Sequence, residues 1–180
     1  AKLAGGVAVI KVENVLSIAR AGRDQIACEE FELEREIRNI WNDLTAAMPS
    51  PPELIVDLAH GEPVKTERPT LNMIFDNLLS NAIRYRDEKK TGSEIRIGTI
   101  RRTDCLQVRV ADNGMGIPET SLPRIFRMFE RIDERSGDGM GLSLVRKQIE
   151  RLGGEISVTS TEGDGAEFTF TIPLQSEVSA

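Results

Sequence analysis

The sequence has few aromatic residues, two cysteines, one histidine and no excess of positive charge. Aromatic residues make up only 4% of its 180 positions, so the core must be built mainly from aliphatic side chains. The formal net charge of −6 argues against a nucleic-acid-binding surface, because phosphate backbones select basic patches. Cys28 and Cys105 lack metal-ligand spacing and favour a reducing, cytoplasmic location. No apolar run reaches the length that crosses a bilayer.

The pattern of apolar residues predicts one globular domain that follows an N-terminal helix at residues 2–21. This helix is amphipathic, so it either packs on its own domain or pairs with another helix, and we favour pairing. Two adjacent hairpins exclude a purely parallel sheet, and we therefore predict an α+β two-layer sandwich with a mixed, largely antiparallel sheet. A short strand at 64–67 is expected to return beside the strand at 54–58. The other expected helices are 34–48, 70–84, 121–130 and 142–152, and the other strands are 26–33, 94–100, 105–111, 155–160 and 167–172.

The turn at residues 112–117 is the first candidate for a binding site. Asp112 follows directly after an alternating strand, and Gly114 and Gly116 allow backbone angles or close approaches that a Cβ would prevent. A carboxylate in this place can accept hydrogen bonds from an exocyclic amine or hold a metal ion. An ordinary β-turn uses the same residue types, so the turn alone leaves both interpretations open.

The predicted helix at 70–84 carries a polar edge beside its apolar stripe. Asn77 and Asn81 are four residues apart and Arg84 follows three residues later, which places all three on one edge. Carboxamide oxygens can bind Mg²⁺, which takes substrate phosphates as further ligands, and an arginine offsets phosphate charge. Taken alone, this helix favours the simpler interpretation of solvent-facing polar residues.

A glycine-rich segment, Gly137-Asp138-Gly139-Met140-Gly141, precedes the predicted helix at 142–152. Exposed backbone N–H groups and the positive end of the helix dipole make such a segment an anion site. Combined with Asp112, Asn81 and Arg84, this site predicts a purine nucleoside triphosphate bound with Mg²⁺.

In combination, these motifs resemble the ATP-binding catalytic domain of sensor histidine kinases, within the wider fold shared with Hsp90, gyrase B and MutL. The resemblance covers residues 28–176, while residues 1–24 resemble the end of a dimerisation and phosphoacceptor helix. The residues that follow the N box, which is the motif at 77–85, are similar to those of phytochrome-like kinases. Residues 77–85 resemble the N box, 112–117 the G1 box, 125–131 the F box, 137–142 the G2 box and 163–168 the closing glycine motif.

The resemblance implies a role for each matching residue. Asp112 would receive the adenine amine, Gly116 would let the base approach, and Asn81, supported by Asn77, would hold Mg²⁺. Arg84 would steady the phosphates. The implied nucleotide-binding set is Asn81, Tyr85, Asp112, Gly114, Gly116, Ile117, Gly137, Gly139, Met140, Gly141 and Leu142, and the implied catalytic set is Asn77, Asn81, Arg84 and Arg131, with Arg135 as an alternative to Arg131.

The acceptor histidine of the family is absent from the sequence. The sole histidine, His60, lies in a predicted turn without the helical setting of an acceptor. The resemblance therefore implies ATP and Mg²⁺ as ligands, and an acceptor histidine domain upstream or on a partner. It also implies a response regulator as partner and a homodimer in the full-length protein, with no nucleic acid and no membrane segment in this chain.

Three departures from the family pattern keep other functions open. Asp138 stands where the family often has a small hydroxyl residue, Ala166 replaces a common threonine, and the lid at 131–137 is short. One alternative is a degenerate nucleotide-binding or protein-interaction module. Another is an anti-sigma serine kinase, although that group usually carries a carboxylate where this chain has Asn77.

Overall fold

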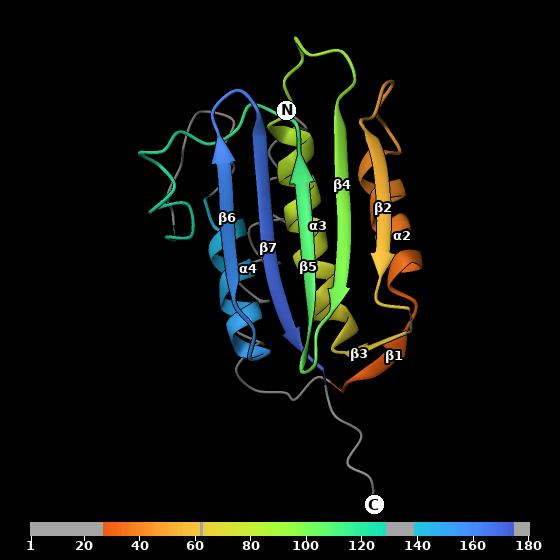
Figure 1. The fold of residues 1–180 in the computed structure, drawn as a ribbon. Helices are drawn as coiled ribbons and strands as arrows, with labels where there is room; N and C mark the ends of the chain where they lie inside the picture. The colour runs from red at the N-terminus through yellow and green to blue at the C-terminus, as the bar shows by residue number, and fades with distance from the viewer. Residues whose placement is uncertain (1–26, 62, 129–138, 175–180) are drawn as a thin grey trace, which may run out of the picture.

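A mixed sheet and three helices on one of its faces make up the described residues of the computed structural model, which are 27–61, 63–128 and 139–174 (Figure 1). The predicted helix at 2–21 lies outside these residues. The helices are α2 (Leu33–Thr45), α3 (Arg68–Arg84) and α4 (Gly141–Arg151). The strands are β1 (Glu29–Phe31), β2 (Glu53–Ala59), β3 (Val64–Thr66), β4 (Glu94–Arg101), β5 (Cys105–Asp112), β6 (Ile156–Thr161) and β7 (Gly165–Pro173).

The main sheet has five strands in the order β2-β4-β5-β7-β6. β2 and β4 are parallel, and the other three pairs are antiparallel, which confirms the predicted α+β fold with a mixed sheet. Alternating residues of β4 and β5 face the helices, for example the cross-strand pair Ile97 and Val110, which are 1% and 2% exposed. The register therefore follows the hydrophobic alternation, because a slip by one residue would turn this apolar face to solvent.

Helix α3 lies behind the centre of the sheet and carries the largest share of the core (Figure 1). The ring of Phe75 packs edge-on against that of Phe170 from β7, with 6.0 Å between centroids. Burying each large apolar side chain here stabilises the fold by about 1.5–3 kcal/mol. The fully buried α3 residues follow the predicted helical stripe: Leu71, Ile74, Phe75, Leu78 and Leu79.

Two local predictions are wrong. Strand β3 does not return beside β2; it pairs with β1 in a separate two-stranded ribbon, where Phe31 lies opposite Val64. This pairing lets both side chains enter the core, and Val64 is only 2% exposed. The segment predicted as a helix at 121–130 forms consecutive turns over its described residues 121–128, with Arg124 N–H donating to the Ser121 carbonyl at 2.9 Å. Pro123 explains the difference, because it lacks an N–H and disfavours helical geometry at the residue before it.

Helix α4 ends where the predicted glycine stop stands. The N–H of Gly154 donates to the carbonyl of Ile149 at 2.9 Å, and that of Gly153 donates to Glu150 at 3.0 Å. These two bonds form the motif that satisfies the last carbonyls of a helix. Among the described helices, none is long and apolar enough to span a membrane.

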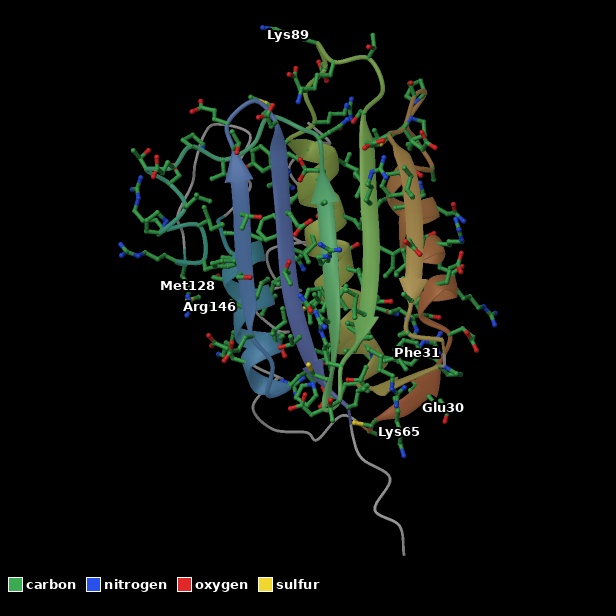
Figure 2. All side chains as sticks on the ribbon, in the orientation of Figure 1. Glu30, Phe31, Lys65, Lys89, Met128 and Arg146 are labelled. Atoms are coloured by element: carbon green, nitrogen blue, oxygen red, sulfur yellow. The ribbon has the colours of Figure 1, made fainter. Side chains whose placement is uncertain are left out.

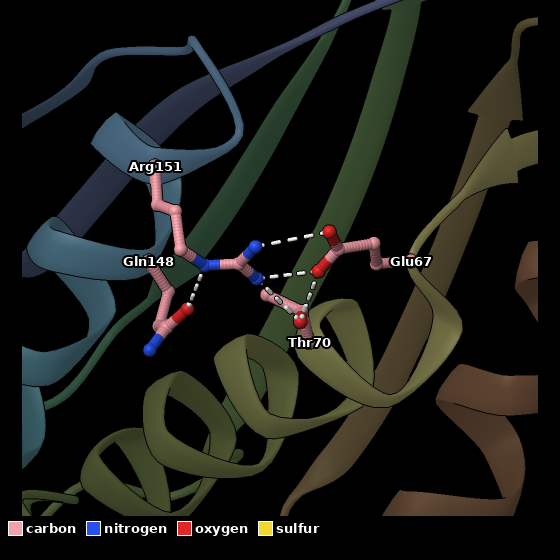
Figure 3. A network of polar contacts seen from close by, with 4 residues as sticks. All are labelled: Glu67, Thr70, Gln148 and Arg151. Atoms are coloured by element: carbon pink, nitrogen blue, oxygen red, sulfur yellow. Dashed lines mark hydrogen bonds and ion pairs between the residues drawn. The ribbon is translucent and has the colours of Figure 1, made fainter. Parts of the chain in front are cut away.

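A buried polar network joins the start of α3 to the end of α4 (Figure 3). The guanidinium of Arg151 donates to both carboxylate oxygens of Glu67, with 2.9 Å between Nη1 and Oε1, and also to Thr70 at 2.9 Å. Arg151 Nε donates to Gln148 at 2.8 Å. Glu67, Thr70 and Gln148 are 8%, 5% and 3% exposed, and the pairing with Arg151 holds the pKa of Glu67 below its ordinary value.

Candidate functional site

A cavity of about 240 Å³ lies between the C-terminal end of α3, the end of β5 and the first turn of α4. Its walls come from segments far apart in the sequence, so only the fold brings them together. Apolar side chains predominate, and Asp112 and Glu162 are its carboxylates, which suits a flat apolar ligand that carries a hydrogen-bond donor. The lining residues are Asn81, Ala82, Tyr85, Asp112, Met115, Gly116, Ile117, Pro118, Leu142, Glu162, Ala166 and Phe168.

Asp112 is the last residue of β5 and is held between two strands, opposite Ile95 of β4 and Ala166 of β7. Its Oδ1 accepts a hydrogen bond from the N–H of Gly114 at 2.9 Å. Burial raises the pKa of the Asp112 carboxyl, while backbone N–H donors at Gly114 and Ala166 and the charge of Lys90 act in the opposite direction. A half-buried carboxylate that lines a cavity can accept a hydrogen bond from a ligand N–H.

The glycines of the turn after β5 are required by close packing. Gly116 has φ of +69°, and a Cβ at this position would lie 2.1 Å from the carbonyl oxygen of Thr161. A Cβ at Gly114 would lie 2.5 Å from the carbonyl oxygen of Tyr85. The turn is therefore held between the end of α3 and the β6–β7 turn, and Gly116 and Ile117 line the cavity.

Asn77 and Asn81 of α3 occupy different positions. Asn81 lines the cavity, whereas Nδ2 of Asn77 donates to the Met73 carbonyl at 2.8 Å and its Oδ1 faces the start of α4. A Cβ at Gly141 would lie 2.9 Å from this Oδ1. Arg84 is exposed and is absent from the cavity lining.

These asparagines suit a particular kind of metal site. In the described parts of the chain, no group of three His, Cys, Asp or Glu side chains is placed to hold a metal ion by itself. Amide oxygens from Asn81 and Asn77 fit Mg²⁺, because this ion keeps several waters and takes most of its remaining ligands from substrate phosphates.

The start of α4 faces α3 beside the cavity. Gly139 has φ of +72°, Met140 is 6% exposed, and Leu142 in the first turn lines the cavity. The side chain of the N-cap residue Met140 does not cap α4. The Cβ position of Gly141 lies 2.9 Å from Oδ1 of Asn77, so the first turn of α4 lies beside this asparagine. The N–H groups and the positive dipole end of a helix N-terminus favour an anion there, and an anion site at α4 stays a prediction.

Some predicted site residues are not brought into the cavity, and several cavity residues were missed. Arg131, Arg135, Gly137 and Asp138 lie outside the described residues, as does the segment 1–24. Four further predicted residues do not line the cavity: Gly114, Gly139, Met140 and Gly141. Six lining residues were missed, of which Pro118 and Glu162 lie outside every motif, while the others lie within the segments 77–85, 112–117 and 163–168 and could have been found there. The missed lining residues are Ala82, Met115, Pro118, Glu162, Ala166 and Phe168.

Residues 66–176 match the family described as histidine kinase-, DNA gyrase B-, and HSP90-like ATPases. The chain is 34% identical over 169 residues to cyanobacterial phytochrome A of Nostoc sp., with 91% of this chain and 21% of that protein covered. It is also 34% identical over 173 residues to the adaptive-response sensory kinase SasA of Crocosphaera subtropica, covering 91% of this chain and 44% of that protein. The chain thus spans about a fifth of the length of the first relative and less than half of the length of the second.

Two solved structures share the fold. The catalytic domain of the histidine kinase ThkA matches with a TM-score of 0.68 and 27% identity, over 82% of this chain and 95% of that one. Full-length ShkA in complex with AMPPNP matches with a TM-score of 0.78 and 23% identity, over 94% of this chain and 36% of that one. Both matches agree with the described two-layer arrangement of helices and sheet.

Proposed function

The chain belongs to the family of histidine kinase-, DNA gyrase B-, and HSP90-like ATPases, and from this we propose that it is a catalytic module that positions Mg-ATP for phosphoryl transfer to a histidine outside the chain. The module would act within a two-component sensor kinase in the cytoplasm, where ATP is available. Its partners would be a dimerisation domain carrying the acceptor histidine and a response regulator, with a homodimer formed by the full-length protein.

One observation supports the proposal above all others: a half-buried carboxylate, Asp112, lines a largely apolar cavity together with Asn81 and with Leu142 from the first turn of α4. The apolar wall, which includes Ile117 and Phe168, would cover the two faces of an adenine ring. Asp112 would accept the hydrogen bond of its exocyclic amine, and the α4 N–H groups would bind phosphate oxygens.

Asn81 and Asn77 are the residues that would hold the magnesium ion. Mg²⁺ supplies neutralisation of the phosphate charge when bound. Asn81 is placed at the cavity, and the bond from Asn77 Nδ2 to Met73 leaves the Asn77 oxygen directed toward α4. In the transfer, the bond from the γ-phosphorus to the bridging oxygen of ADP breaks and a bond to an imidazole nitrogen forms, so the chain contributes mainly positioning.

The only histidine of the sequence does not serve this site. His60 lies at the end of β2, where Nδ1 is 2.7 Å from the hydroxyl oxygen of the buried Thr99, and it is absent from the cavity lining. Burial also lowers the pKa of the His60 imidazole. The acceptor would therefore be presented from outside the described residues.

The first test is calorimetric titration of a non-hydrolysable ATP analogue into the chain, with and without Mg²⁺. We expect micromolar binding with Mg²⁺. In Asn81→Ala, the gain in affinity that Mg²⁺ gives should fall by roughly tenfold or more. Asn39→Ala on the exposed surface of α2 is the matched control and should bind as the unmutated chain does. The second step is transfer of label from γ-labelled ATP to an added helical protein that carries an acceptor histidine.

An absence of binding at millimolar nucleotide would contradict the proposal and favour a protein-interaction module. Binding without transfer to any acceptor would retain the nucleotide site but remove the kinase activity from the proposal.

A further inference from the structure

Lys90, in the segment between α3 and β4, makes an unusual set of contacts for a lysine in a polar loop. Its Nζ donates to the backbone carbonyls of Asn113 at 2.8 Å, Gly114 at 3.3 Å and Gly163 at 2.5 Å. An ammonium group has three donors, and three carbonyl acceptors surround this one. Its neighbour Lys89 is exposed and points away from the molecule (Figure 2).

The three carbonyls belong to two different turns, and both turns form walls of the cavity. The turn after β5 contributes Gly116 and Ile117, and the β6–β7 turn contributes Glu162. Two further bonds connect the same region: Gly163 N–H donates to the Met115 carbonyl at 2.7 Å, and Ile117 N–H donates to the Ser160 hydroxyl at 2.8 Å. Lys90 is the charged member of this connection, and none of the motifs in the sequence identified it.

We propose that Lys90 is a positioning residue for base recognition: it fixes the two turns against each other behind Asp112, so that the cavity selects a base with an amino group over one with a carbonyl group at the same place. The inference rests on the proposed nucleotide-binding function. It assigns the preference for adenine over guanine to a residue that does not itself line the cavity.

The physical reason is the position of the turn that holds Asp112. Lys90 binds the carbonyls of Asn113 and Gly114, and the Gly114 N–H donates to Oδ1 of Asp112 at 2.9 Å, so the lysine fixes the donor that orients this carboxylate. A carboxylate accepts the hydrogen bond of an exocyclic amine, whereas a protonated carboxyl group can donate to a carbonyl oxygen. Burial favours the protonated form of Asp112, and the N–H groups of Gly114 and Ala166 favour the carboxylate, with a smaller contribution from the charge of Lys90. The other titratable groups on the neighbouring elements are Tyr85 at the end of α3, Glu94 of β4, which is paired with Arg96, and Glu162 and Asp164 of the β6–β7 turn.

The test compares neutral and charged replacements of Lys90 in the whole chain. Lys90→Gln and Lys90→Met both remove the charge, and two are used because either one can disturb local packing. Lys90→Arg keeps the charge, and Lys89→Gln is the matched control with the same charge change on the exposed neighbour. Affinities for non-hydrolysable ATP and GTP analogues are measured by calorimetry from neutral to acidic pH, and thermal unfolding confirms that each variant is folded.

We expect the neutral variants to bind the ATP analogue on the order of tenfold more weakly and to lose most of their preference over the GTP analogue. Their binding should also fall at a higher pH on acidification, because Asp112 then takes up its proton more readily. A merely structural lysine would lower the unfolding temperature and leave both the ATP-to-GTP ratio and the pH profile unchanged.

Folded neutral variants with an unchanged ratio and pH profile would overturn the inference, as would an equal effect of Lys89→Gln. Failure of the unmutated chain to bind either analogue is a different result, because it would overturn the proposed nucleotide binding itself.

Discussion

The two ends of the α3–α4 pair contain polar residues in opposite arrangements. At one end, Glu67, Thr70, Gln148 and Arg151 bond to one another and fill the space between the helices (Figure 3). At the other end, Asn81 and the start of α4 border a cavity of about 240 Å³. Polar groups that satisfy each other stabilise a fold, whereas polar groups directed into a cavity are available to a ligand. The difference indicates which end is structural and which is functional.

The pKa shifts at the two ends have opposite signs. The pKa of Glu67 is lowered, chiefly by its bond to Arg151, so its ionised form stabilises the fold. The pKa of Asp112 is raised by burial, so its ionised form is held at a cost to stability. Residues kept in an unfavourable state are typical of functional sites, where stability is lower than the fold alone would allow.

The largest expected effect comes from Asp112→Asn. Binding of an ATP analogue should fall on the order of 100-fold, because the amide presents an N–H donor beside the adenine amine. Stability without nucleotide should be equal or higher at neutral pH, because the raised pKa of Asp112 makes the unmutated fold less stable as pH rises above the ordinary aspartate value.

Calorimetry and thermal unfolding measure the two halves of this prediction. Asp57→Asn, an equal charge change at an exposed position of β2, is the control. Loss of binding together with loss of stability would place Asp112 among the structural residues and break the contrast between the two ends.

Glu67→Gln should give the converse result. We expect a loss of about 2–3 kcal/mol in the free energy of unfolding, because the buried side chain of residue 67 loses its charged hydrogen bonds to Arg151, which is itself partly exposed. In the unmutated chain, ionised Glu67 contributes this stability fully above the ordinary glutamate pKa. The contribution is lost as the pH falls through the lowered pKa of Glu67.

Urea unfolding at neutral and acidic pH measures this, and the difference between variant and unmutated chain should shrink toward low pH. Glu34→Gln, which removes a half-exposed ion pair with Arg38, should cost under about 1 kcal/mol. A nucleotide affinity reduced as strongly as in Asp112→Asn would show that the two ends are not separable.

The smallest effect on stability is expected for Gly141→Ala at the start of α4. Alanine favours a helix over glycine by up to about 1 kcal/mol, and the close contact of its Cβ with Asn77 opposes this gain. The free energy of unfolding should therefore change little. The alanine Cβ would lie 2.9 Å from Oδ1 of Asn77 and displace that oxygen, which should weaken Mg²⁺-dependent binding roughly fivefold.

Gly98→Ala in β4 is the control, because its Cβ would make only an ordinary contact at 3.7 Å. If Gly141→Ala bound the Mg²⁺ complex of an ATP analogue as tightly as the unmutated chain, the Asn77 oxygen would have no part in the metal site.

Patterns within single segments were sufficient to predict much of the fold. The i, i+3, i+4 repeat that includes Phe75 and Leu78 predicts α3, and the alternation of Val108 and Val110 predicts β5, because each period determines which side chains share a face. Pairing between distant segments could not be predicted in the same way. Strand β3 pairs with β1 and not with β2, because the partner of a short strand depends on how the surrounding core packs.

The sequence by itself also determined which residues are candidates for the site, namely Asp112, Asn77, Asn81 and the glycines around them, because their combination and order resemble the motifs of one family. Only the tertiary structure decided which of them share a cavity, that Asn77 turns toward α4 while Asn81 lines the wall, and that Lys90 reaches carbonyls of two distant turns. A side chain's partners depend on the packing of elements that are distant in the sequence, 73 residues for Lys90 and Gly163 and 84 for Arg151 and Glu67, and no local pattern encodes such a distance.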